Sequence, residues 1–251
     1  MKGTVLITGA SGGFGLLFAQ ALEKQGYALL LHGRDKARLQ MTLDSLKQPQ
    51  SHRVLLSGLS ARKDVDEFIE QILLEDDLLG VVNNAGFGAW GAFEMCESVP
   101  QLDVLRVDLL APVMLTHALL PRLKRQKGFV INVSSLAGET PLPYMSTYGA
   151  AKAGLTFWSE ALRAELQGLV RVVTLAPGPS PTGFRDVSGA PKAKGGLFST
   201  SPNIVVDAAM QNLSQGGGYC VPGWRHKALW CLQKLMPRIL SLPIMAHYLK
   251  P

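Results

Sequence analysis

The sequence has little that would place the protein in an oxidising compartment or within a membrane. Its 251 residues include three cysteines, Cys96, Cys220 and Cys231, which form neither a close metal-type pair nor an even set for disulfides. No uninterrupted apolar run approaches the roughly 20 residues needed to span a bilayer. A strand is predicted almost at Met1, which leaves no room for a cleavable signal peptide. We therefore expect a cytoplasmic protein without a metal site.

Acidic residues are also scarce at one end of the chain. None follows Asp207, whereas the basic residues of this segment are Arg225, Lys227, Lys234, Arg238 and Lys250, and the formal net charge is +6. A nucleic-acid-binding protein would need a known motif or a dense basic stripe, and the sequence has neither. An anionic cofactor or an anionic surface accounts for the basic excess equally well.

Apolar runs alternate with helical patterns along the chain, which is 47% hydrophobic and 18% charged. The predicted strands are Gly3–Thr8, Tyr27–Leu31, Val54–Leu56, Leu78–Val82, Phe129–Ser134, Val170–Leu175 and Tyr219–Val221. Continuously apolar strands joined by helices indicate a parallel sheet covered on both faces. Right-handed connections then give a doubly wound, Rossmann-type α/β fold, with ligands beyond the strand carboxyl ends. Without a linker or repeat, residues 1–251 form one domain.

A glycine-rich turn joins the first strand to the first helix, with the sequence Thr8-Gly9-Ala10-Ser11-Gly12-Gly13-Phe14-Gly15. Gly9 permits the tight turn, Gly13 lets the backbone approach a pyrophosphate, and Gly15 allows close helix packing. The helix N-terminus offers free N–H groups to phosphates. This strand-loop-helix context predicts dinucleotide binding.

The end of the second strand reads His32-Gly33-Arg34-Asp35. An NAD site usually carries a carboxylate at the strand end to accept a hydrogen bond from the ribose. Arg34 suits a 2′-phosphate instead, through a charge-assisted, forked contact. The alternative is that Arg34 is solvated and Asp35 only caps the next helix. We predict NADP(H) rather than NAD(H).

The segment from Phe129 to Lys152 carries the chemistry. A predicted strand ends at Ser135, and Tyr148 and Lys152 lie four residues apart on a helix, so they share one face. With the glycine turn, Asn83-Asn84-Ala85-Gly86 and Pro177-Gly178 in this order, the chain resembles the short-chain dehydrogenase/reductase family. The resemblance is close from about Lys2 to Thr182.

The resemblance implies a role for each matching residue. Tyr148 exchanges a proton with the substrate oxygen, Ser135 hydrogen-bonds the carbonyl, and Lys152 holds the nicotinamide ribose. The Lys152 ammonium is also expected to lower the pKa of Tyr148. The cofactor contacts implied, besides Tyr148 and Lys152, are Gly9, Ser11, Gly13, Phe14, Gly15, Arg34, Leu59, Asn84, Ala85, Gly86, Pro177, Gly178 and Thr182.

The chain departs from the family pattern at Asp108, where asparagine is usual and supports a proton-relay water through its backbone carbonyl. Pro112 lacks an N–H and so leaves the Asp108 carbonyl without its helical donor. We infer that the water site survives. The Asp108 side chain either influences Lys152 and Tyr148 or is purely structural, and the sequence favours neither. A second departure is Gly58, where aspartate is frequent, so Leu59 would meet the adenine only through backbone.

Apolar residues are expected around the substrate: Trp90, Phe93, Met145, Phe184, Leu197 and Phe198. Residues 182–201, rich in glycine, serine, proline and lysine, are predicted to form a flap over the site. The tail, residues 224–251, reads as two short amphipathic helices interrupted by Pro237 and Pro243. It packs on its own domain or a partner subunit, or it contacts an anionic membrane peripherally.

We therefore predict an NADPH-dependent oxidoreductase that reduces an apolar ketone or aldehyde, reversibly, and that forms a homo-oligomer. One alternative is a 3-oxoacyl thioester reductase, for which Lys192 and Lys194 in the flap would receive an acidic carrier. A second alternative, from another class, is an NADP(H)-binding sensor or scaffold without turnover.

Overall fold

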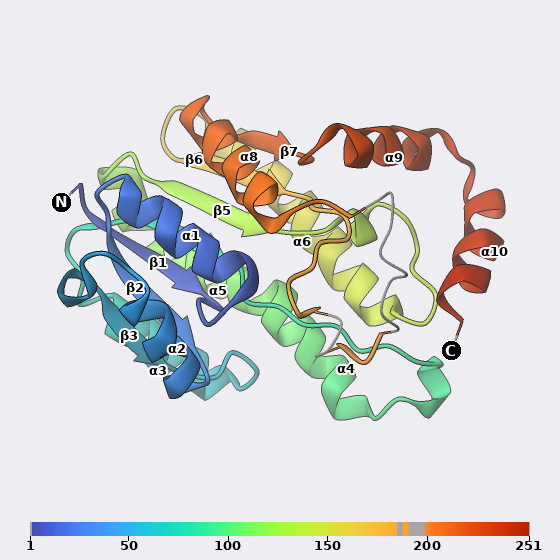
Figure 1. Ribbon diagram of the computed structural model, residues 1–251, viewed down its shortest axis with the longest axis horizontal. Helices are drawn as coiled ribbons and strands as arrows, with labels where there is room; N and C mark the ends of the chain where they lie inside the picture. The colour runs from blue at the N-terminus through green and yellow to red at the C-terminus, as the bar shows by residue number, and fades with distance from the viewer. Residues whose placement is uncertain (1, 185–187, 191–198, 251) are drawn as a thin grey trace.

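Seven parallel strands form one sheet in the order β3-β2-β1-β4-β5-β6-β7 in the computed structural model, which describes residues 2–184, 188–190 and 199–250 (Figure 1). The strands are β1 (Thr4–Thr8), β2 (Ala28–Gly33), β3 (Arg53–Leu56), β4 (Leu78–Asn83), β5 (Phe129–Val133), β6 (Arg171–Leu175) and β7 (Gly218–Cys220). This order and the parallel pairing confirm the doubly wound, single-domain fold expected from the sequence.

The described helices are α1 (Gly13–Lys24), α2 (Lys36–Asp44), α3 (Arg62–Ile72), α4 (Ser98–Leu105), α5 (Ala111–Arg125), α6 (Ser146–Glu165), α8 (Pro202–Ser214), α9 (Trp224–Leu235) and α10 (Arg238–Leu249). Three short 3-10 turns cover Pro49–Ser51, Phe93–Met95 and Leu136–Gly138, and one π-helical turn covers Arg106–Leu110. In Figure 1, α9 and α10 lie at the opposite end of the molecule from the N-terminus.

Both faces of the sheet are buried because successive strand residues point to opposite sides. In β1, Val5 and Ile7 pack with α1, α2 and α8, whereas Leu6 packs with α3, α5 and α6. All three side chains are fully buried. The continuously apolar strand pattern therefore reflects helices on both faces.

The long helical stretch from Ser98 to Arg125 contains an irregular turn. The π-helical segment Arg106–Leu110 separates α4 from α5 and ends two residues before Pro112, which has no N–H to continue the regular hydrogen-bond ladder. Glu97 precedes α4 and makes no side-chain cap.

One helical stretch among the described residues, Ser98–Arg125, is long and apolar enough to cross a membrane by length and composition. Its residues Leu115, Leu119 and Leu123 are fully buried in the cluster that covers one face of the sheet. Those apolar side chains therefore serve the core.

The two tail helices differ from the predicted tail in one respect. Pro237 separates α9 from α10, as expected, but Pro243 lies inside α10 and does not end it. The carbonyl of Ile239, four residues before Pro243, consequently lacks a regular helical donor. The flap predicted over residues 182–201 lies largely outside the described residues.

The strand order reverses between β1 and β4, so their carboxyl ends face a common crevice. Buried amide and hydroxyl side chains cross-link the neighbouring strands below it. Asn83 of β4 donates to Asn132 of β5 at 2.8 Å, and Asn132 donates to Ser159 of α6 at 2.9 Å. Buried hydrogen bonds of this kind fix the relative position of the elements that carry the site.

We expect the replacement Phe129→Ala to lower the free energy of unfolding by about 3–5 kcal/mol, because this ring is fully buried at the start of β5. Denaturant unfolding measures the loss. The matched control Phe157→Ala removes an exposed ring of α6 and should change stability by less than about 0.5 kcal/mol. Equal losses in both variants would contradict this placement of the core.

Candidate active site

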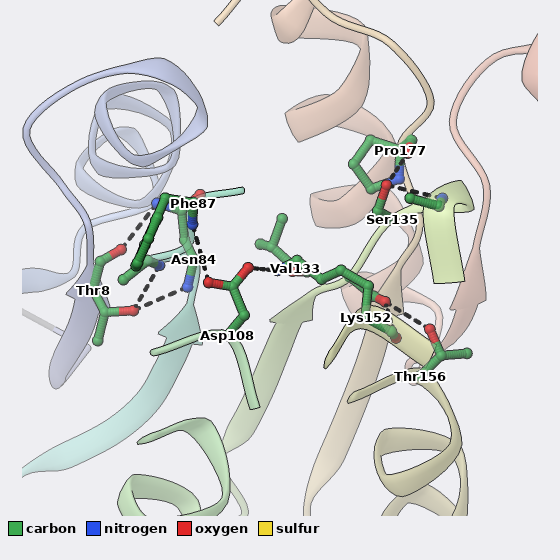
Figure 2. Close-up of polar contacts among 12 residues, drawn as sticks. Thr8, Asn84, Phe87, Asp108, Val133, Ser135, Lys152, Thr156 and Pro177 are labelled. Atoms are coloured by element: carbon green, nitrogen blue, oxygen red, sulfur yellow. Dashed lines mark hydrogen bonds and ion pairs between the residues drawn. The ribbon is translucent and has the colours of Figure 1, made fainter. Parts of the chain in front are cut away.

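The residues singled out by the sequence gather at the carboxyl ends of four adjacent strands. Figure 2 shows Thr8 at the end of β1, Asn84 after β4, Ser135 after β5 and Pro177 after β6. Helix α6 brings Lys152 to the same place, where it meets Asp108 of the π-helical turn. The site is therefore assembled from segments far apart in sequence.

The glycine turn after β1 adopts the conformation that its sequence predicts. Gly9 and Gly13 have φ angles of 65° and 55°, a region that favours glycine. A Cβ on Gly15 would lie 2.2 Å from the Gly9 carbonyl oxygen, so the helix packs too closely for a side chain there. Ser11 and Phe14 belong to the same turn, and the Phe14 ring packs against the core.

The turn fits the pyrophosphate of a dinucleotide. Helix α1 begins after Gly12, and no side chain caps its first N–H groups, which leaves them available to an anion. A Cβ on Gly13 would lie 3.3 Å from Thr182, so the loop after β6 approaches the glycine turn from the other side. The expected contacts Gly13 and Thr182 are thus neighbours.

Thr8 and Asn84 hold the glycine turn against the end of β4. The Thr8 hydroxyl accepts hydrogen bonds from the backbone N–H groups of Asn84 and Ala85, both at 3.0 Å. The Asn84 amide donates to the carbonyls of Thr8 and Gly9 at 2.9 and 3.1 Å (Figure 2). The Asn84 side chain therefore supports the nucleotide loop from below.

Two arginines flank the end of β2. Arg34 is exposed directly after the strand, and Asp35 accepts a hydrogen bond from the Arg38 N–H at 3.0 Å, so its carboxylate is engaged as the cap of α2. The sequence analysis did not name Arg38, yet its guanidinium lies 3.0 Å from where a Cβ on Gly12 would be. Its place in the first turn of the helix that Asp35 caps was an available signal.

Tyr148 and Lys152 share the inner face of α6, as their spacing predicted. Both are buried, with exposed fractions of 8% and 4%, and the Lys152 ammonium lies 5.8 Å from the centre of the Tyr148 ring. The Ser135 side chain lies close enough to the Tyr148 hydroxyl to oppose the rise of its pKa. The Ser135 hydroxyl also accepts from the Ala137 N–H at 3.1 Å, which fixes its position after β5.

Asp108 makes direct contact with Lys152. The Asp108 Oδ2 lies 3.1 Å from the Lys152 Nζ, and Oδ1 accepts from the Phe87 N–H at 3.0 Å. Lys152 also donates to the Val133 carbonyl at 2.9 Å. A Cβ on Gly86 would lie 2.7 Å from Asp108 Oδ2, so this glycine makes room for the pair.

The ion pair changes the electrostatic expectation for Tyr148. Burial raises the pKa of the Tyr148 hydroxyl well above its usual value, the Asp108 carboxylate raises it further, and the hydrogen bond with Ser135 opposes both effects. Burial also raises the pKa of Asp108, against the Lys152 ammonium and the Phe87 N–H. The expectation that Lys152 brings the Tyr148 pKa down is wrong for the protein alone, because burial of the hydroxyl and the Asp108 carboxylate both raise it.

The loop after β6 is supported by a residue that the sequence analysis missed. The Gly178 N–H donates to Nδ1 of His226 at 3.3 Å, and a Cβ on Gly178 would lie 2.6 Å from His226 Nε2. His226 is fully buried and comes from α9. The Pro177 carbonyl accepts from the Leu136 N–H at 3.0 Å, which joins this loop to the Ser135 segment.

Other predicted residues have different surroundings. Leu59 is 5% exposed and its side chain belongs to the core, so any adenine contact falls to its backbone. Met145, Trp90 and Phe184 join Tyr148 in one apolar cluster, and the Phe184 ring lies 5.1 Å from that of Tyr148. Phe93 is 68% exposed and does not join it. Lys192, Lys194, Leu197 and Phe198 lie outside the described residues.

The sequence matches a family model described as short chain dehydrogenase over residues 3–192. The chain belongs to this family. A ketoacyl reductase of Nostoc sp. (strain PCC 7120) is 31% identical over 218 residues, which cover 83% of this chain and 74% of that protein. A 3-ketodihydrosphingosine reductase of Bacteroides thetaiotaomicron is 31% identical over 189 residues, covering 72% of this chain and 65% of that protein.

Solved structures agree with this assignment. A short-chain dehydrogenase from Sphingobium yanoikuyae in complex with NADPH has a TM-score of 0.83 and 26% identity, covering 97% of this chain and 95% of that one. A family member from Burkholderia phymatum in complex with NAD has a TM-score of 0.81, and the match covers 96% of this chain and 95% of that one. At 22% identity, this match shows the fold alone. The protein is therefore an oxidoreductase acting on CH–OH or C=O groups, as expected, and the non-catalytic alternative is not supported.

We expect Asp108→Asn to shift the pH dependence of alcohol oxidation. Oxidation requires Tyr148 as phenolate, so its rate rises as pH passes the Tyr148 pKa. Removing the Asp108 charge lowers that pKa and moves the rise to lower pH by about one unit or more. Profiles of kcat/KM against pH measure the shift.

The matched control is Asp103→Asn, which breaks a surface pair with Arg106 on the preceding turns of the same helical stretch. Its profile should coincide with that of the native protein. An unchanged profile in Asp108→Asn would show that the carboxylate is purely structural.

Proposed function

We propose that the protein is an NADPH-dependent reductase of apolar ketones or aldehydes, working reversibly as an alcohol dehydrogenase. The observation that carries the proposal is the buried Tyr148 hydroxyl, which interacts with the Ser135 side chain at the edge of an apolar cluster and is backed by Lys152. An apolar pocket with a few convergent polar groups is the usual form of a small-molecule site.

The side chains divide the work of reduction. When bound, the nicotinamide cofactor supplies the hydride. Tyr148 delivers a proton to the substrate oxygen, and its raised pKa keeps it protonated for that step at neutral pH. Ser135 hydrogen-bonds the same oxygen, where negative charge develops. Phe184 and Met145 exclude water from the apolar side of the site.

Lys152 and Asp108 position the proton donor, Tyr148, and provide the route by which it regains its proton. The Lys152 ammonium, held by the Val133 carbonyl and Asp108, leaves a hydrogen-bonding direction for a ribose hydroxyl. Pro112 has no N–H, so the carbonyl of Asp108, four residues earlier on the helix, is available to hydrogen-bond a water. The Asp108 backbone thereby holds the water of the proton relay, and the Lys152 side chain connects that water to Tyr148.

NADP(H) is the proposed cofactor. Arg34 stands exposed at the end of β2, Arg38 reaches the glycine turn, and the nearest carboxylate, Asp35, is engaged as a helix cap. Two guanidinium groups at this edge suit a 2′-phosphate and provide no acceptor for an unmodified ribose. The solved relative that contains NADPH supports this preference.

The substrate carries an apolar group next to the carbonyl. The names of the two curated relatives, a ketoacyl reductase and a 3-ketodihydrosphingosine reductase, both describe keto substrates. The ketoacyl reductase favours a 3-oxoacyl substrate as the second candidate. A panel of aromatic ketones, aliphatic aldehydes and 3-oxoacyl thioesters, followed by nicotinamide absorbance, distinguishes the candidates.

We expect Tyr148→Phe to reduce kcat/KM for carbonyl reduction by about 10²–10⁴-fold, because the proton donor is lost while the ring and its packing remain. Binding of NADPH, followed by fluorescence, should change less than about twofold, since that hydroxyl is not its main anchor. The control Tyr27→Phe alters a ring that packs against Phe129, away from the site, and should leave both measurements unchanged. Activity above a tenth of native in Tyr148→Phe would contradict the assignment.

We expect Arg34→Ala to raise the KM for NADPH by about 10–100-fold and to leave the KM for NADH nearly unchanged, because a hydrogen bond to a charged group contributes roughly 1.5–3 kcal/mol. Arg38→Ala should act in the same direction. Arg53→Ala, which breaks a surface pair with Glu75, is the matched control. A parallel rise for both cofactors in the Arg34 variant would rule out recognition of the 2′-phosphate.

A further inference from the structure

The outward side of the two tail helices is apolar where a solvated helix would be polar. Leu235 at the end of α9 is 83% exposed, Ile239 at the start of α10 is 80% exposed, and Ile244 is 58% exposed. The other large exposed residues of this surface are Trp224, Leu232, Leu240 and Leu242. We call these seven residues the tail surface. Large apolar residues gathered on exposed sides of neighbouring helices indicate an interaction site.

The inner side of the same helices is anchored to the domain. In α10, Ser241 is buried, and Met245 and Leu249, at spacings of four, pack onto the apolar cluster around Tyr148. The Leu249 carbonyl accepts a hydrogen bond from Trp90 Nε1 at 3.0 Å. Helix α10 therefore has apolar residues on two opposite sides, and only one of them serves the fold.

Helix α9 is held by a buried carboxylate. Glu139, whose side chain is 5% exposed, accepts hydrogen bonds from Tyr219 at 2.5 Å and Trp230 at 3.3 Å, and it pairs with Lys234 at 3.1 Å. These contacts fix which side of α9 faces outward. The exposed positions of Leu232 and Leu235 consequently follow from the anchoring of α9.

The charged side chains of the tail itself have one sign. Sequence positions 208–251 contain no acidic residue, and Lys227 and Lys250 are exposed beside the apolar residues. Arg225, also exposed, places its guanidinium 5.3 Å from the centre of the Trp224 ring. A basic rim around an apolar surface that includes a tryptophan complements the anionic headgroups and acyl chains of a lipid bilayer.

The same charge disfavours a second copy of the chain as the occupant. In a two-fold symmetric dimer the identical surface lies on both sides, so the basic rims would meet each other. Juxtaposed like charges weaken such a contact. From the exposed apolar residues and their basic rim, we propose that α9 and α10 dock the protein peripherally onto anionic membrane surfaces.

The test is flotation of the full chain with vesicles of phosphatidylcholine alone or of phosphatidylcholine mixed with phosphatidylserine. We expect flotation with the anionic vesicles, weaker flotation with the neutral ones, and release by salt, which screens the headgroup attraction. No substrate is needed, so the outcome is independent of the proposed reaction. A chain that stays in the soluble fraction with both vesicles would overturn the proposal.

Two sets of variants locate the contact. Replacing Leu235, Ile239 and Ile244 together with serine should reduce the vesicle-bound fraction at least about tenfold. Replacing Met41, Leu74 and Val99 with serine removes equally exposed apolar residues elsewhere and should leave binding unchanged. Replacement of Lys227 and Lys250 with glutamine, which leaves the apolar residues intact, should weaken binding to anionic vesicles about fivefold for each charge removed.

Equal binding of native protein and the tail variant would contradict the proposal. A second contradicting result is a lower molecular mass of the tail variant by light scattering, with vesicle binding unchanged. That result would assign the tail surface to a second copy of the chain.

Discussion

The buried ion pair between Lys152 and Asp108 is the contact on which the arrangement of the site depends. It joins α6, which carries Tyr148, to the π-helical turn, and the Phe87 N–H ties the same carboxylate to the segment after β4. Both side chains are at most 5% exposed, so separating them would leave an uncompensated charge in the interior. Such a pair contributes little net stability compared with apolar packing, and we propose that its presence beside Tyr148 serves the chemistry of the site. It sets the electrostatic environment in which Tyr148 holds its proton.

The elements around this pair restrain one another through backbone as much as through side chains. Pro177 accepts from the Ser135 segment, and His226 of α9 accepts from Gly178. Glu139 holds the same face of α9 one turn further on, at Trp230. The tail helices are therefore connected to both loops that flank the proposed substrate position. A displacement of α9 would therefore be transmitted through these contacts to the segment of Ser135 and to the loop of Gly178. This connection gives the proposed membrane contact a physical link to the chemistry.

Local sequence determined the strands, the glycine turn and the shared face of Tyr148 and Lys152, because each depends on spacing or on conformations that only glycine adopts. Contacts between distant positions were not predictable in the same way. His226 lies 48 residues from Gly178, and Asp108 lies 44 from Lys152, so periodicity within either segment carries no information about the pair. The raised pKa of Tyr148 follows from its burial and from one such contact, with Asp108, and neither could be derived from the spacing of Tyr148 and Lys152. The outward apolar side of α10 likewise became visible only once Met245 and Leu249 were seen to face inward.

The central claim is that burial and Asp108 together outweigh Lys152 in setting the proton affinity of Tyr148 in the protein alone. Titration of protein labelled with ¹³C in the ring carbon of tyrosine that bears the hydroxyl, followed by NMR, tests it directly. The chain has five tyrosines, and the signal missing from Tyr148→Phe identifies this one. The account predicts that Tyr148 titrates above the ordinary tyrosine value of about 10. A midpoint at or below that value would contradict it.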